Sequence, residues 1–118
     1  MRSFTDLEAW QESHKMGLLI YKISASFPDS EQFGLSSQIR RAVVSVTSNI
    51  AEGFGRKSKK DREHFFTMAS GSLYEVKSQL LFAKDLGYAE DFDYEDLFEQ
   101  MNVAHRLLHG LLRAHRDE

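Results

Sequence analysis

The sequence predicts an all-α protein, an antiparallel up-down-up-down four-helix bundle that occupies residues 1–118 as a single domain. Two observations indicate this fold class. Apolar residues recur every three or four positions along four long segments, as they do on one face of an α-helix. The only proline, Pro28, and short glycine-containing breaks separate these segments, and none of them alternates polar and apolar residues long enough for a strand. Because the breaks are short, consecutive helices should run antiparallel.

The first helix is expected near residues 6–26. Thr5 and Glu8 have the spacing of a capping box, in which two side chains satisfy the free N–H groups at a helix start. The helix should stop at Phe27, because Pro28 disfavours the helical conformation of the residue before it.

The other three helices are predicted from similar signals. The second, over residues 34–54, ends at the glycines of residues 53–55, where a glycine can adopt the left-handed conformation of a helix C-terminus. The third, over residues 59–86, follows Ser58, which is a favourable N-cap. The fourth, over residues 93–115, begins with an aspartate that can cap it.

Length and composition restrict the class of protein. A chain of 118 residues is the size of one domain, and its 42% hydrophobic content with nine phenylalanines can supply one core. The absence of cysteine excludes disulfides and thiolate metal sites. No apolar run has the length of a signal peptide or of a membrane span, so we expect a cytoplasmic protein without a membrane partner.

The first helix carries two apolar stripes on nearly opposite sides, which is more apolar surface than a bundle position needs. The stripe assigned to the core contains Leu7, Trp10, Leu18 and Tyr21. The opposite stripe would face water in a monomer, and such patches usually mark interfaces. We therefore predict a homo-oligomer whose interface contains Met16, Ile20, Ile23, Phe27, Val44 and Ala51. The alternative is that helix crossing angles let a neighbouring helix cover these residues.

Charge is distributed unevenly, although the net charge is only −3. Five of the seven residues 56–62 are basic, whereas residues 85–99 contain seven acids and no base. In this topology the second connection lies beside both termini, so the molecule should have one basic and one acidic end. Candidate nucleic-acid-binding residues are Arg40, Arg41, Arg56, Lys57, Lys59, Lys60 and Arg62. The alternative is a solvated turn whose charges serve solubility.

No catalytic constellation is found. His105 and His109 have a spacing that can hold a metal, but two ligands are too few, and the Glu-x-x-His motif of di-iron bundles is absent. The glycines of residues 53–55 lack the spacing of a phosphate loop. We therefore expect no catalytic residue, no cofactor, no metal and no enzymatic activity.

Several sequence blocks resemble one known family. They are Leu7-x-x-Trp10, FGLSSQIRRAVVSVTSNIAEGFGRKSKK over residues 33–60 and GSLYEVKSQLLFAKDLGY over residues 71–88. The chain is similar to the bacterial four-helix bundle proteins encoded within intervening sequences of 23S ribosomal RNA genes. The resemblance implies a left-handed bundle that assembles as a ring, a homopentamer, with no established enzymatic activity.

The fold also resembles the accessory proteins of diversity-generating retroelements, which bind nucleic acid and a reverse transcriptase through a strongly basic ring. This chain, with a pI of about 5.9, lacks that overall basicity. Two function classes remain open. One is an oligomer that binds RNA or DNA backbones through a basic tip, and the other is a scaffold that binds another protein and no nucleic acid.

Overall fold

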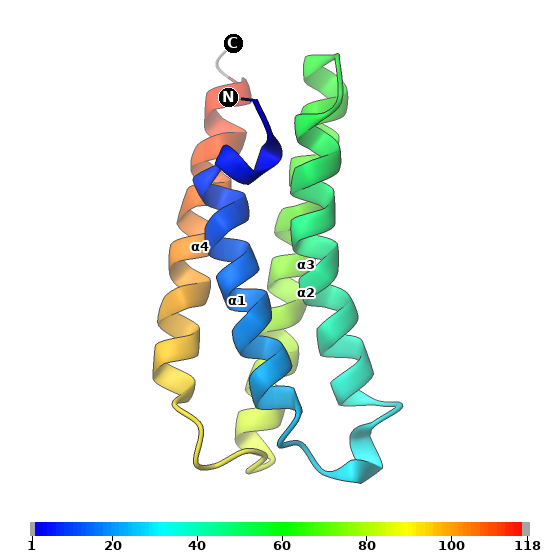
Figure 1. Ribbon diagram of the computed structural model, residues 1–118, viewed down its shortest axis with the longest axis vertical. Coiled ribbons are helices and arrows are strands. Elements are labelled where there is room, and N and C mark those ends of the chain that lie inside the picture. The colour runs from blue at the N-terminus through cyan, green and yellow to red at the C-terminus, as the bar shows by residue number, and fades with distance from the viewer. Residues whose placement is uncertain (1, 117–118) are drawn as a thin grey trace.

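Four long helices pack side by side in the computed structural model, which describes residues 2–116 (Figure 1). They are α1 (Glu8–Ser24), α2 (Leu35–Phe54), α3 (Lys59–Asp85) and α4 (Tyr94–Arg116). Within the described residues there is no strand, and the predicted four-helix bundle is confirmed. Successive connections lie at alternating ends of the molecule, which measures 45 × 25 × 22 Å.

The start of α1 differs from the prediction. A capping box is present, but it joins Ser3 and Asp6 and opens a short 3-10 helix, Phe4–Asp6. Thr5 does not cap α1, because its hydroxyl donates to Ser3 Oγ at 2.9 Å. The α-helix begins only after Leu7, which provides no side-chain cap.

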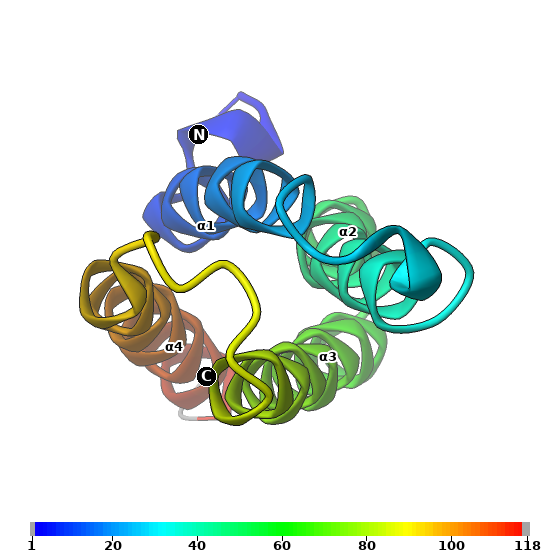
Figure 2. The ribbon, with the colours of Figure 1, turned by 90° about the horizontal axis from the view of Figure 1, so that it is seen from below.

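One hydrophobic core runs the length of the bundle, and the helices surround it as Figure 2 shows. Small residues lie where α2 packs against α3. Ser45 Oγ and Ser72 Oγ are 2.8 Å apart, and a Cβ on Gly53 would lie 2.6 Å from Phe66 Cε1. Small side chains at these positions allow the two helices to pack closely.

The predicted interface on α1 is wrong for four of its residues. Met16, Ile20, Ile23 and Phe27 are buried inside the bundle and belong to the core. In the opposite stripe, Leu18 and Tyr21 face outward instead, exposed to 60% and 45%, whereas Leu7 is buried and Trp10 packs against the core. The alternative reading of the sequence, in which neighbouring helices cover the Met16 stripe, is therefore correct.

A physical difference between the stripes accounts for this outcome. The inner stripe consists of fully apolar Met, Ile and Phe side chains, which have no polar atom to satisfy. The outer stripe contains Trp10, His14 and Tyr21, which combine an apolar ring with a polar group and tolerate partial exposure.

The two ends of the bundle are closed differently. At one end, Tyr88 Oη donates to Glu31 Oε2 at 2.8 Å, and the Tyr88 ring contacts Phe27. Gly87 has a φ of +78°, a left-handed conformation that suits glycine at the end of α3. The α2–α3 connection lies at the other end of the bundle, together with the start of the described chain and the end of α4 (Figure 1). None of the described helices is long and apolar enough to cross a membrane.

Candidate nucleic-acid interface

The basic tip, defined as residues 56–62, forms the turn between α2 and α3 and the first residues of α3. Ser58 caps α3 as predicted, because its Oγ accepts from the Asp61 N–H at 3.1 Å. Lys59 Nζ donates to the Arg116 carbonyl oxygen at 3.2 Å, which ties the turn to the end of α4. The predicted position of this turn beside the chain ends is therefore confirmed.

Three of the five cations in the basic tip make intramolecular contacts. Arg62 donates to the Lys57 carbonyl oxygen at 2.8 Å and closes the turn. Arg56 pairs with Glu52 at 2.9 Å and lies over the Phe65 ring. Lys59, besides its bond to α4, has a carboxylate oxygen of Glu63 at 3.9 Å.

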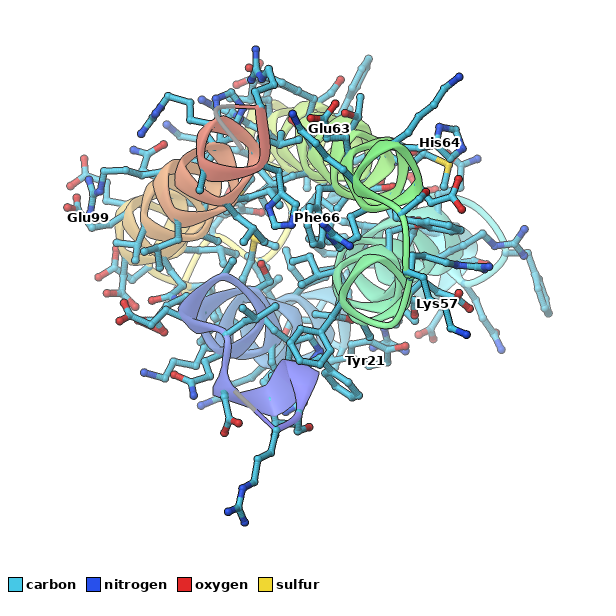
Figure 3. The ribbon with its side chains drawn as sticks, turned by 90° about the horizontal axis from the view of Figure 1, so that it is seen from above. Tyr21, Lys57, Glu63, His64, Phe66 and Glu99 are labelled. Atoms are coloured by element: carbon cyan, nitrogen blue, oxygen red, sulfur yellow. The ribbon has the colours of Figure 1, made fainter. Side chains whose placement is uncertain are left out.

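Lys57 and Lys60 have a different environment. Both side chains are exposed, and neither makes a hydrogen bond or ion pair with another residue of the described chain. Figure 3, which looks onto this end of the bundle, shows Lys57 on the outside of the turn. The ammonium groups of these two lysines are therefore available to bind an external anion.

Arg40 and Arg41 do not join the basic tip. Arg40 lies 14 residues before the end of α2 at Phe54, or about 21 Å along the axis. Its Nε donates to Ser24 Oγ at 2.7 Å, and its guanidinium lies over the Tyr21 ring, so that it braces the end of α1 against α2. Arg41 is exposed and lines the same surface cavity as Arg40.

An outward-facing apolar groove lies between α1 and α2. Its volume is about 190 Å³, and it is lined by His14, Gly17, Leu18, Tyr21, Val43, Val44 and Thr47. Val44 is exposed to 46%, and Ala51 is half-buried further along α2. Both therefore lie outside the core. Val44 shares the groove with Leu18, and Ala51 lines a different surface hollow beside Ser48 and Arg56.

A second polar surface lies on α4, where sequence reasoning considered only a metal site. His105 and His109 have ring centroids 4.3 Å apart. They share a groove with Asn102, Arg106 and Arg113. The spacing of three and four residues was visible in the sequence and could have revealed this basic face. No group of three or more potential metal ligands occurs in residues 2–116.

The environment of His105 is the main electrostatic feature of this surface. Burial lowers the pKa of His105, and repulsion by His109 and Lys77 lowers it further. Its Nε2 is buried and has no hydrogen-bond partner, which suits a neutral ring.

Together these features define a class of protein, an antiparallel four-helix bundle with a basic end and an outward-facing apolar groove. A sequence model of the 23S rRNA-intervening sequence protein family matches residues 5–110. The chain belongs to this family. No curated protein matches the chain at a significant level.

Proposed function

We propose that this protein is a non-enzymatic homo-oligomer, a pentameric ring, that binds the phosphate backbone of nucleic acid through its basic tip. The observation that carries the proposal is the exposure of Lys57 and Lys60 at one end of an otherwise acidic chain, without a carboxylate partner in the described residues. The family description, which refers to an RNA gene, also supports nucleic acid as the ligand. The proposal places the protein in the cytoplasm.

The chemistry of the basic tip favours contacts to phosphates over contacts to bases. Residues 56–62 contain no aromatic side chain that could stack on a base. Contacts to phosphate carry little sequence information, so binding should be weakly specific. A ring would present several tips to one polyanion, which raises the effective affinity above that of a single tip.

Fluorescence anisotropy with labelled duplex DNA and RNA, at low and moderate salt, tests the proposal. We expect Lys57→Gln/Lys60→Gln to weaken binding and to flatten its salt dependence by roughly one unit of slope per lost phosphate contact. Lys15→Gln/Lys22→Gln removes two exposed cations from α1, one of which, Lys15, pairs with Glu12 at 3.1 Å, and serves as the control for lost positive charge. Equal binding by the tip variant and the control would exclude the basic tip as the binding surface.

Self-association is supported by the apolar surface between α1 and α2. Leu18, Tyr21 and Val44 are large side chains that remain accessible beside one groove. Exposed apolar patches of this kind commonly mark subunit contacts. We therefore assign the subunit interface to the Leu18 stripe in place of the Met16 stripe.

A protein-interaction scaffold is the second candidate function. It is favoured by apolar side chains elsewhere on the surface, including Phe33, exposed to 91% in the α1–α2 connection, and Phe82, exposed to 64% on α3. Two results together would support this candidate over the first. The wild type would bind a protein partner, and Phe33→Ser or Phe82→Ser would abolish that binding. The wild type would also bind no nucleic acid.

A further inference from the structure

A groove on the outer side of α4 gathers basic side chains. It has a volume of about 320 Å³ and is lined by Asn102, His105, Arg106, His109 and Arg113. We refer to these five residues as the α4 groove. Successive members are one, three or four residues apart, which places them on one side of the helix. The two guanidinium groups and the two imidazoles therefore face a common space.

The positive charge of the α4 groove is not balanced by a neighbouring acid in residues 2–116. None of the ion pairs in that range includes Arg106 or Arg113. On α3, Lys77 adds a further cation that acts on His105. The nearest acid on α4, Glu99, lies one turn before Asn102 on the same side of the helix and forms no ion pair with the arginines. Its side chain points away from the bundle in Figure 3. A groove whose arginines are not ion-paired attracts an external anion.

His105 makes the charge of the groove dependent on pH. On α3, the Tyr74 ring packs at right angles to the His105 ring, and Ser70 Oγ lies 3.4 Å from His109 Nε2. The groups that act electrostatically on His105 are His109 and Lys77, both basic. An anion in the groove would offset this repulsion and favour protonation of His105.

The spacing of the arginines suits a polymer of phosphates. Arg106 and Arg113 are seven residues apart, or about 10 Å along the axis, which corresponds to about three nucleotides of one duplex strand. A guanidinium offers two parallel donors that match a phosphate. The groove also leads toward the basic tip, because Arg116 lies one turn beyond Arg113 and contacts Lys59.

We infer that the α4 groove is a second phosphate-binding surface, along which a nucleic-acid backbone held at the basic tip continues down α4. The inference rests on the proposed function for its class of ligand, but its residues are different. Because His105 lies in the groove, acidification should strengthen binding there. His64 and His115 lie beside the tip, so the response of the groove is the part of the pH dependence that His105→Gln removes.

The test uses the assembled protein and a fluorescein-labelled 20-base-pair DNA duplex, with anisotropy measured at pH 7.5 and 6.0 and several salt concentrations. We expect Arg106→Gln/Arg113→Gln to weaken binding roughly fivefold or more and to lower the salt slope by about one to two units. The wild type should bind more tightly at pH 6.0 than at pH 7.5, and His105→Gln should reduce this difference. Lys15→Gln/Lys22→Gln is the charge-matched control, and Arg106→Gln alone is the fallback if the double variant does not fold.

The outcomes separate this inference from the proposed function. If the tip variant Lys57→Gln/Lys60→Gln loses binding and Arg106→Gln/Arg113→Gln does not, the inference is wrong and the tip proposal stands. If only the groove variant loses binding, the inference stands and the tip proposal is wrong. No binding of the duplex by the wild type contradicts both. Binding of poly-glutamate with the same dependence on Arg106 and Arg113, in the absence of DNA binding, contradicts the assignment of nucleic acid as the ligand.

Discussion

Gly53 shows how a single residue sets the distance between α2 and α3. An added Cβ would lie 2.6 and 2.8 Å from two carbons of the Phe66 ring and 3.1 Å from Phe65 Cβ. Phe66 is buried and packs edge-on against His115, so its ring has little room to move. The glycine is therefore required by packing, although it lowers the helix propensity of α2.

Gly53→Ala should destabilise the fold by about 1–3 kcal/mol, because overpacking of Phe66 outweighs the gain in helix propensity. Gly71 on α3 provides the matched control, since nothing lies within 4 Å of its added Cβ. Gly71→Ala should stabilise by up to about 1 kcal/mol. Urea denaturation followed by circular dichroism measures both changes, and a stabilising Gly53→Ala would contradict the packing argument.

His105 should make stability depend on pH. Burial, then His109 and Lys77, lower its pKa in the folded state, so the unfolded chain binds the proton more readily. Stability is therefore retained above the unfolded pKa of about 6.5 and is lost as the pH falls below it. The urea midpoint of the wild type should fall between pH 7.5 and 5.5, and His105→Gln should reduce this fall. His64→Gln, at an exposed position of α3 that Figure 3 labels, should leave the fall unchanged.

At the scale of the elements, the periodicity of the sequence predicted all four helices, with bounds within about two residues of those observed. It did not predict which face of α1 is buried. Both stripes have helical spacing, and periodicity locates a face without stating what covers it. The choice depends on packing against α2 and α4, where the Ile20 side chain fits fully inside the bundle.

The candidate site was predictable to a similar extent. The sequence located the basic tip, because five cations in seven residues fall in one turn and the topology places that turn beside both chain ends. It could not show that Arg62 would close the turn through carbonyl groups, since such bonds depend on the path of the backbone. The prediction that Arg40 belongs to the tip is wrong because more than three turns of α2 separate it from the end of the helix.

Because the Met16 stripe of α1 is buried in the core, introducing a charge there should affect folding and not subunit association. Ile20→Glu/Ile23→Glu would place two carboxylates in the core, where burial of an unpaired charge is strongly unfavourable. We expect loss of the folded state, measured as loss of helical circular dichroism, and not a folded monomer. A cooperative thermal transition like that of the wild type would show that these residues are not buried.

At the scale of the whole molecule, the apolar groove between α1 and α2 and the two charged ends determine how copies can meet. Leu18→Glu/Val44→Glu changes two exposed residues and should leave the fold intact. Because the carboxylates would be desolvated in a subunit contact, the variant should sediment as a monomer while the wild type sediments as an oligomer. Lys84→Glu, at an exposed position of α3 away from the groove between α1 and α2, is the control for added negative charge.

An unchanged oligomer mass in Leu18→Glu/Val44→Glu, with helical content preserved, would place the subunit contact on another face. The exposed Phe82 and Leu86 of α3 would then be the next residues to test.

The end of α4 contacts the basic tip through Arg116, and the start of the described chain lies at the same end of the bundle (Figure 1). An affinity tag or fluorescent protein fused at either terminus would therefore stand next to the surface assigned to nucleic acid, and a polyhistidine tag would add its own cations there. The connection between α3 and α4 lies at the far end of the bundle, and Glu90 and Asp91 within it are exposed. A cysteine introduced at Asp91, in a chain that has no other cysteine, would carry a dye about the length of the bundle away from the tip.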